Sequence, residues 1–243
     1  MPLYRDVGVV TRTHKLGETD RIITIVTQDS GKVRAVAKGV RKPGSRFGSR
    51  LEPMSHVQLQ LYRGRDLDIV NQVELVEIAN GIRADLERTT EGLAMCEIVE
   101  MLAQDRSPSP HLYRMLVGAL RQLNFHHSKL VLPALQLRLL EAEGVGPCVD
   151  RCIECGATDD LVAFDVSAGG TQCRMHRRGI GVSAATLTIL QDVLSGKVSA
   201  VLNRAPVAAV IVREVASCAR AAMEHHLERR IKASSLFEAA RDE

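Results

Sequence analysis

Two pairs of metal-ligating residues at a fixed interval constrain the fold of this chain more than any other feature. Cys152 and Cys155 form a C-x2-C pair, and Cys173 and His176 form a C-x2-H pair, with seventeen residues between the two pairs. A two-residue gap lets one tight turn present both side chains to one ion, and tetrahedral zinc needs two such pairs. Gly156 suits the first turn because glycine adopts a positive φ without steric strain. The spacing therefore predicts a zinc-binding module.

The fourth ligand has two candidates. Cys148 lies four residues before Cys152 and could replace His176. We favour His176, because it completes a second pair of the same spacing. Four protein ligands leave no coordination position for water or substrate, which indicates one structural zinc ion. The P-C-x2-C part of the zinc deaminase signature is not matched, because the cysteine after Pro147-Cys148 comes one residue too late.

Bulk composition is that of a globular protein. The chain has 243 residues and 45% hydrophobic residues, enough for a core and for two modest domains. Its apolar runs are far shorter than the roughly 20 residues that span a membrane, so we expect no membrane partner. Arg5 and Asp6 interrupt the first residues, unlike a signal peptide. We therefore expect a cytoplasmic protein, and in that reducing compartment clustered cysteines favour metal over disulfides.

The first eighty residues predict a small β-barrel. Short segments rich in β-branched residues or with alternating apolar residues lie at 7–13, 21–27, 32–37, 57–62 and 67–76. Asp29-Ser30-Gly31 predicts a hairpin turn between the second and third of them. Closing the strands into a barrel removes the sheet edges, so we expect a five-stranded OB-type β-barrel.

After residue 81 the apolar period changes from two to about 3.6, which predicts helices. They are expected at 85–104, 112–123, 130–143, from the N-cap Ser183 to Gly196, and at 207–230, with a frayed tail at 241–243. Since helices lie on both sides of the cysteine segment, we predict an α+β multidomain fold. Its parts are an OB-fold domain over 1–80, an α-helical domain over 81–146 and 181–243, and an inserted zinc-binding module over 147–180.

Positive charge is concentrated in one segment. Residues 31–65 contain nine lysines and arginines and one acid, Glu52, a formal charge of +8 in a chain whose net charge is +3. Such a segment predicts a local site for a polyanion. Its centre, residues 39–48, has three glycines and a proline and is expected to be a loop. Ser45 stands where a phosphate-binding P-loop requires lysine, so a nucleotide-hydrolysis site is not predicted.

Aromatic residues are scarce in this segment. Phe47 lies in the loop and Tyr62 at a nearby strand end. Proteins that bind single strands usually stack bases on aromatic rings. The scarcity predicts binding dominated by phosphate contacts, with little sequence preference and a steep salt dependence.

Several motifs, in this order along the chain, resemble the RecO family of recombinational DNA-repair mediators. The first is Gly17-Glu18-Thr19-Asp20-Arg21-Ile22, between the first two strands. Others are Ala37-Lys38-Gly39-Val40-Arg41-Lys42 followed by Ser45-Arg46, and the approach to the zinc module with Gly146-Pro147, Asp150 and the residues 152–156. Gly169-Gly170 precedes the second ligand pair. The resemblance covers nearly the whole chain.

The resemblance implies a non-enzymatic protein with an OB-fold, a helical domain and a zinc module. It implies binding of single- and double-stranded DNA, annealing of complementary strands and, with RecR, help to RecA in replacing single-strand-binding protein. A nucleoid-associated cytoplasmic location goes with this role. The candidate DNA contacts are the basic residues that match the family's basic barrel face, together with Arg34 of the same segment: Lys38, Arg41, Lys42, Arg46, Arg50 and Arg34. The family usually has cysteine where His176 stands.

Two other hypotheses fit part of the pattern. An RNA-binding OB-fold protein with a zinc ribbon would carry the same charges, and competition between single-stranded DNA and RNA separates the two. A zinc hydrolase is the third hypothesis, and the closed set of four ligands argues against it.

Overall fold

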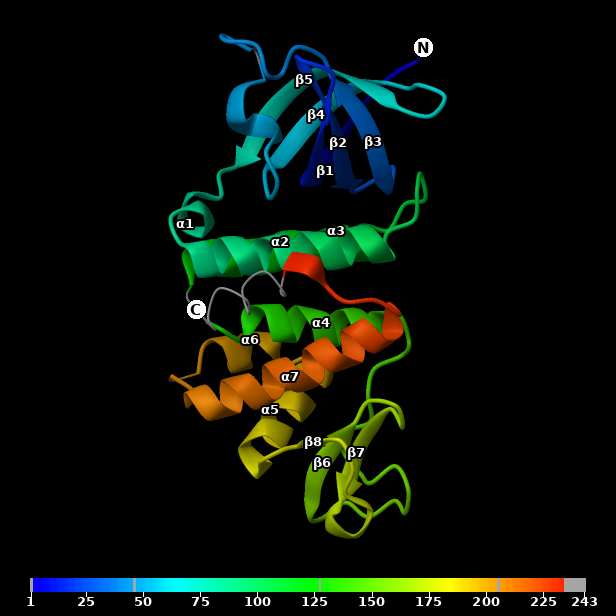
Figure 1. The fold of residues 1–243 in the computed structure, drawn as a ribbon, viewed down its shortest axis with the longest axis vertical. Helices are drawn as coiled ribbons and strands as arrows, with labels where there is room; N and C mark the ends of the chain where they lie inside the picture. The colour runs from blue at the N-terminus through cyan, green and yellow to red at the C-terminus, as the bar shows by residue number, and fades with distance from the viewer. Residues whose placement is uncertain (1, 46, 127, 205, 234–243) are drawn as a thin grey trace. The chain divides into compact units, whose positions relative to one another are not determined.

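The computed structural model describes residues 2–45, 47–126, 128–204 and 206–233 (Figure 1). Arg46 and the predicted frayed tail at 241–243 lie outside the described residues. The chain forms two compact units, one of Met1–His126 with Ile231–Glu243 and one of His127–Arg230. The domain boundaries expected from the sequence, at residues 80, 146 and 180, stay a prediction.

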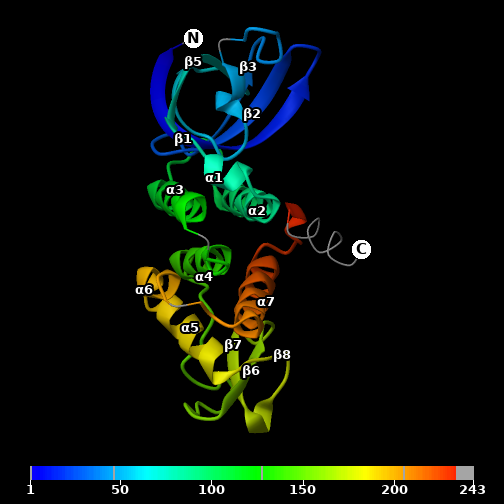
Figure 2. The same cartoon turned by 90° about the vertical axis from the view of Figure 1, so that its left-hand side faces the viewer.

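The first unit is built on a closed five-stranded barrel, which confirms the predicted OB-type fold. Its strands are β1 (Leu3–Leu16), β2 (Asp20–Thr27), β3 (Lys32–Ala37), β4 (His56–Tyr62) and β5 (Asp68–Glu77). The order around the barrel is β1-β2-β3-β5-β4, and Figure 2 shows the strands as a ring. Neighbouring strands are antiparallel except β3 and β5, whose parallel pairing closes the barrel.

A bend in β1 makes this closure possible. Residues 8–16 of β1 pair with β2 and residues 3–9 pair with β4, with a bulge between Val10 and Arg12. A bulge bends a strand and increases its twist, so one strand can serve two parts of the barrel. The predicted hairpin turn ends at Gly31, where a side chain would collide with the Ser107 carbonyl. Only glycine fits this close approach of two backbones.

The barrel interior is filled by alternate apolar residues from the strands. Two further residues come from the connection between β3 and β4: Phe47, and Leu51 in the short helix η1 (Gly48–Leu51). Phe47 is only 2% exposed. The sequence interpretation counted it as an aromatic residue of the loop that could stack on bases. That reading of Phe47 is wrong, because its ring belongs to the hydrophobic core.

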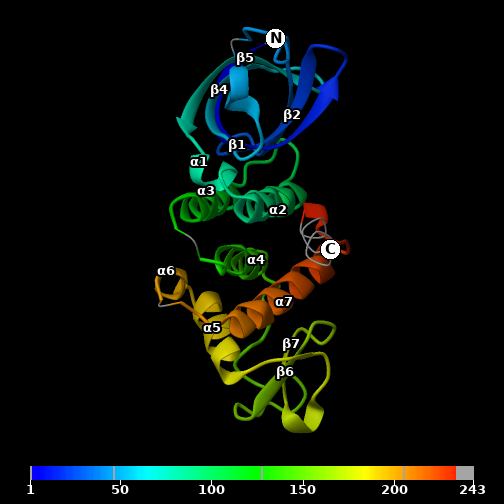
Figure 3. The same cartoon turned by 60° about the vertical axis from the view of Figure 1, so that its left-hand side comes forward.

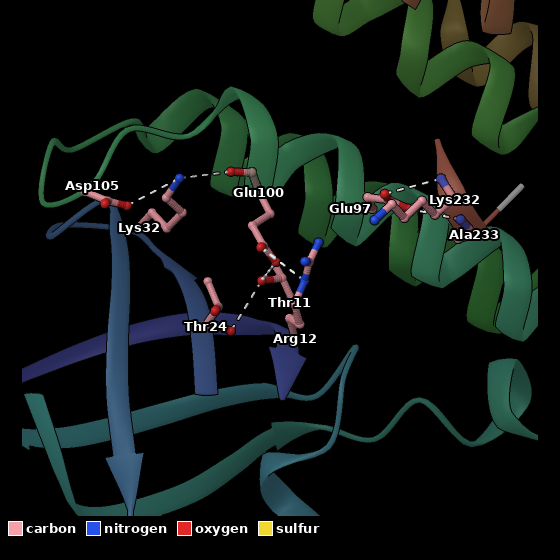
Figure 4. Close-up of polar contacts among 9 residues, drawn as sticks. All are labelled: Thr11, Arg12, Thr24, Lys32, Glu97, Glu100, Asp105, Lys232 and Ala233. Atoms are coloured by element: carbon pink, nitrogen blue, oxygen red, sulfur yellow. Dashed lines mark hydrogen bonds and ion pairs between the residues drawn. The ribbon is translucent and has the colours of Figure 1, made fainter. Parts of the chain in front are cut away.

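Three helices follow the barrel along the chain: α1 (Asn80–Arg83), α2 (Leu86–Leu102) and α3 (Pro110–Phe125). The Asp85 carboxylate caps α2 by accepting from the Arg88 amide at 2.9 Å. Glu100 of α2 accepts from the Thr11 hydroxyl at 2.8 Å and pairs with Arg12 at 3.2 Å, so α2 is bonded to β1 (Figure 4). Pro110 begins α3, in agreement with proline's preference for the first turn.

The chain also returns to this unit after residue 230. Ile231 is fully buried. The amides of Lys232 and Ala233 donate to the two carboxylate oxygens of Glu97 in α2, at 3.2 and 3.0 Å (Figure 4). The chain therefore joins the second unit to the first at both of its ends.

The described residues of the second unit form four α-helices and a small sheet, which Figure 3 shows. The helices are α4 (Val131–Ala142), α5 (Ala184–Leu194), α6 (Val198–Leu202) and α7 (Ala209–His226). The strands are β6 (Leu161–Asp165), β7 (Gly170–Cys173) and β8 (Ile180–Gly181), in the order β7-β6-β8. Ser183 caps α5 as predicted, accepting from the Thr186 amide. The sequence did not predict α6 or the three strands, which are too short to show a period.

One hydrophobic core runs through the second unit. It joins Leu137 of α4, Leu190 of α5 and Cys218 of α7 to Phe164 of β6 and Cys152. The small sheet is thus packed on the helices through shared apolar contacts. Within the described part of the chain, every helix is too short or too polar to cross a bilayer.

Candidate metal centre and nucleic-acid interface

The small sheet positions the four predicted metal ligands. Cys173 ends β7, and the next turn, η2 (Arg174–His176), ends with His176. Cys152 and Cys155 lie in a turn closed by the Gly156 amide, which donates to the Cys152 carbonyl at 2.8 Å. Gly156 has a φ of 77°, the conformation expected for it from the sequence. Both turns therefore present two ligands each, as the spacing predicts.

The four ligand atoms lie close enough together to surround one ion. All lie within 4.8 Å of one another. The Cys155 and Cys173 sulfurs are 3.9 Å apart, and His176 Nδ1 is 3.7 Å from the Cys152 sulfur and 3.3 Å from the Cys173 sulfur. Zinc bonds of roughly 2.3 Å to sulfur and 2.0 Å to nitrogen imply ligand separations of about 3.5–3.8 Å in a tetrahedron. A disulfide would need sulfurs about 2.05 Å apart. The cluster could therefore hold a metal ion.

Cys148, the alternative ligand, lies apart from this cluster. Its thiol faces the Asp150 carboxylate at 3.2 Å. The backbone around it is bonded to β7, because Thr171 donates its amide to the Cys148 carbonyl at 2.8 Å. Cys148 thus helps to attach the first ligand turn to the sheet, while the structure groups His176 with the three other cysteines.

Local hydrogen bonds favour the thiolate form at two of the ligands, Cys152 and Cys173. The contact with His176 lowers the pKa of the Cys173 thiol, and the same contact raises the pKa of His176. Burial raises the pKa of Cys152, but backbone amides, those of Cys173 and Cys155 first, outweigh it and bring the pKa to about 6. Thiolate is the form of cysteine that binds metal, so these two shifts suit a metal ligand, whereas the pKa of Cys155 is raised and His176 would have to be neutral to bind.

The second candidate site is the basic loop, defined here as residues 38–45 after β3. The Gly39 amide donates to the Asp20 carboxylate at 2.7 Å, and the Arg41 amide donates to the Thr19 carbonyl at 2.9 Å. The Arg41 guanidinium reaches the Gly17 carbonyl at 3.4 Å. The basic loop is thus held against the turn that joins β1 to β2.

The structure exposes the predicted DNA contacts that it describes. Lys38, Arg41 and Lys42 are exposed in the basic loop, Arg34 is exposed on the outward face of β3, and Arg50 is exposed in η1. Lys38 and Lys42 both act on the Asp20 carboxylate, so these two charges lie near one point. Whether these residues bind DNA stays a prediction, and the same holds for Arg46.

Other basic residues near the barrel have acidic or aromatic partners. Lys32 contacts Asp105 and the Glu100 carbonyl, both at 3.3 Å (Figure 4). Arg106 pairs with the buried Asp68 at 3.0 Å, and the Arg63 guanidinium lies 4.8 Å from the centre of the Tyr4 ring. These charges are engaged in holding the first unit together.

Sequence reasoning missed the residues that hold the basic loop. Asp20 accepts from Gly39 and from the Thr19 hydroxyl, and these two bonds, the first of them foremost, lower the pKa of its carboxyl. Arg21 pairs at 2.6 Å with Glu52, the single acid of residues 31–65. Asp20 and Arg21 both belong to the Gly17–Ile22 motif that the sequence analysis identified. The search for a polyanion site considered only basic residues, so it assigned no role to Asp20.

The fold and the metal site define an OB-barrel protein with a helical region and a four-ligand centre. Comparison with protein families agrees: a family model described as Recombination protein O N terminal matches residues 1–79. A second, described as Recombination protein O C terminal, matches residues 83–235. The chain therefore belongs to the RecO family, which supports a mediator role in recombinational DNA repair.

Proposed function

We propose that the first unit binds the sugar–phosphate backbone of DNA through the basic loop, Arg34 and Arg50, with Arg46 included on its sequence position. The observation that carries this proposal is the cluster of exposed charges of Lys38, Arg41 and Lys42, held beside the β1–β2 turn. Cations that neutralise phosphates release counterions, so affinity needs no reading of bases. With Phe47 buried, Tyr62 is the exposed one of the two aromatic residues near the basic segment, so we expect contacts to phosphate to dominate those to bases.

The proposed activity is that of a mediator, without bond-making chemistry. One basic surface that binds both single- and double-stranded DNA lowers the repulsion between two strands and so promotes their annealing. With RecR, the protein would help RecA to replace single-strand-binding protein on DNA. These partners follow from the family, and a cytoplasmic, nucleoid-associated location follows from the proposed ligand.

We also propose one structural zinc ion at Cys152, Cys155, Cys173 and His176. Four protein ligands close its coordination sphere, so the ion would hold the two ligand turns together rather than activate water. This small sheet has only short strands and shares its core with the helices. Zinc would supply folding free energy that such a module lacks.

Charge reversal tests the DNA site. We expect Arg41→Glu with Lys42→Glu to weaken binding of a labelled single-stranded oligonucleotide by more than about ten-fold at low salt. The slope of log K against log salt should become shallower by about 1.4, since each phosphate contact on a single strand contributes about 0.7. Fluorescence anisotropy across a salt series measures both quantities.

The matched control reverses Arg213 and Arg229 of the second unit, which are also exposed and give the same change in net charge. Unchanged binding by the loop variant, or equal weakening by the control, would refute the proposed site. Competition with RNA of the same sequence tests the RNA-binding alternative. Annealing of complementary oligonucleotides, with and without RecR and single-strand-binding protein, tests the mediator activity.

A further inference from the structure

We propose that Asp20 is a positioning residue for nucleic-acid binding: its carboxylate holds the basic loop in its binding conformation, so that this acid strengthens the binding of a polyanion. The inference rests on the proposed function of the loop. By its charge alone, Asp20 would be expected to weaken DNA binding, because a carboxylate repels phosphate.

The geometry of Asp20 supports this role. It is the first residue of β2, where the backbone is fixed by pairing with Leu16 of β1. Its Oδ1 atom accepts from the Gly39 amide at 2.7 Å and from the Thr19 hydroxyl at 2.9 Å. A short bond from a rigid strand to the second residue of the loop fixes where the loop leaves the barrel. Charge-assisted hydrogen bonds of this kind are among the stronger ones in proteins.

The conformation of the loop depends on this first bond. Gly39 has a φ of 66°, and its carbonyl accepts from the Lys42 amide at 3.1 Å, which forms a turn. That turn places Arg41 above the β1–β2 turn, where its amide bonds to Thr19 at 2.9 Å. Asp20 therefore fixes Gly39, and the turn that begins at Gly39 fixes the positions of Arg41 and Lys42.

A second contact holds the other end of the connection between β3 and β4. Arg21, the neighbour of Asp20 on β2, pairs at 2.6 Å with Glu52, which follows η1. Phe47 and Leu51 fix the same stretch by inserting into the barrel core. These contacts anchor the chain after the basic loop, while Asp20 holds the start of the loop.

Electrostatic repulsion and loop ordering predict effects of opposite sign. If Asp20 acts only as a negative charge, its removal strengthens binding to DNA. If Asp20 orders the loop, its removal weakens binding, because the loop of the variant is disordered before DNA binds and must lose conformational freedom on binding. Fixing one backbone residue is worth about a five- to thirty-fold change in affinity.

The test compares Asp20→Ala with Glu18→Ala. Glu18 lies on the same turn and is exposed, so its replacement removes the same charge without touching the loop. We expect Glu18→Ala to bind single-stranded DNA as tightly as the wild type or more tightly. We expect Asp20→Ala to bind about five- to thirty-fold more weakly, with a shallower salt dependence, although both variants melt at the wild-type temperature.

Two further variants separate the hydrogen bond from the charge. Asp20→Asn keeps an oxygen acceptor for the Gly39 amide and should restore binding to at least the wild-type level. Gly39→Ala strains the same contact from the loop side without changing any charge, and should weaken binding like Asp20→Ala. Hydrogen exchange at residues 39–45 should be faster in Asp20→Ala and unchanged in Glu18→Ala.

Binding by Asp20→Ala as tight as by Glu18→Ala would overturn the proposal. So would an Asp20→Asn variant as weak as Asp20→Ala, or a Gly39→Ala variant that binds like the wild type. The proposed function fails separately: in that case reversal of Arg41 and Lys42 leaves DNA binding unchanged. If the reversal weakens binding and Asp20→Ala does not, only the positioning role is refuted.

Discussion

His56 shows how one buried ring couples the stability of the barrel to pH. It is the first residue of β4 and is 8% exposed. Its Nε2 atom lies 2.8 Å from the Tyr113 hydroxyl of α3, while Nδ1 has no hydrogen-bond partner among the described residues. Burial lowers the pKa of His56, Arg121 lowers it further, and Glu77 acts in the opposite direction. Protonation would place a positive charge in the core, on a ring whose Nδ1 has no hydrogen-bond acceptor among the described residues.

The direction of this shift gives a pH prediction. An unfolded histidine has a pKa of about 6.5, so the folded state binds fewer protons than the unfolded state as the pH falls below that value. The contribution of His56 is present above about pH 6.5 and is lost as the pH falls through the lower folded-state pKa. We expect the melting temperature of the wild type to drop more steeply between about pH 7.5 and pH 5 than that of His56→Gln.

Thermal unfolding followed by circular dichroism at several pH values measures this difference. His14→Gln is the control, since His14 is exposed on β1. Identical pH profiles for the wild type and His56→Gln would contradict the prediction.

Phe47 is the residue for which the interpretation of the sequence was wrong. Phe47 stands among basic residues in a glycine-rich stretch, and its neighbours suggested an exposed loop. The chain turns inward at this residue and η1 follows, so that Phe47 and Leu51 fill the barrel. Local composition cannot show that a loop residue enters a core formed by strands distant in sequence.

The end of β7 and the adjoining η2 supply two of the four candidate metal ligands, and substitutions there test the assignment. We expect His176→Ala to lose tightly bound zinc, because three ligands with water in the fourth position bind a structural ion more weakly than four protein ligands do. Cys148→Ala should keep one zinc ion per chain, since that thiol faces Asp150 instead.

Metal analysis of the purified variants after dialysis against a chelator measures zinc retention. His176→Cys serves as a second check, because cysteine is a competent ligand with the same spacing. Zinc loss from Cys148→Ala together with retention by His176→Ala would contradict the assignment and favour the other candidate ligand.

At the scale of the whole molecule, the two proposed sites belong to different units. The four candidate ligands and the core around them lie within residues 130–219, whereas the basic loop and the barrel core lie within residues 4–73. Each unit contains its own hydrophobic core.

This separation predicts how the protein responds to metal removal. We expect a strong chelator to increase hydrogen exchange in residues 148–176, because the ligand turns lose their link. Exchange in β1–β5 should stay the same, and the affinity for single-stranded DNA should change by less than about two-fold. Hydrogen-exchange mass spectrometry and fluorescence anisotropy on the same samples provide both measurements. Loss of DNA binding in step with zinc would show that the first unit depends on the metal.

The sequence by itself determined the features that depend on residues close together in the chain. Alternation and turn residues predicted the five strands, the 3.6-residue period predicted the longer helices, and paired spacing predicted the metal ligands. These patterns are readable because the physics behind them acts over a few residues: side chains alternate on a strand, and one tight turn can present two ligands.

Only the tertiary structure decided the contacts between distant residues. It buried Phe47 in the barrel, placed the Asp20 carboxylate on the Gly39 amide and bonded Glu97 to the chain at Lys232 and Ala233. The grouping of His176, rather than Cys148, with Cys152, Cys155 and Cys173 also needed the positions of β7 and η2. Such contacts depend on how the barrel closes and how the helices pack, and no short stretch of sequence contains both partners.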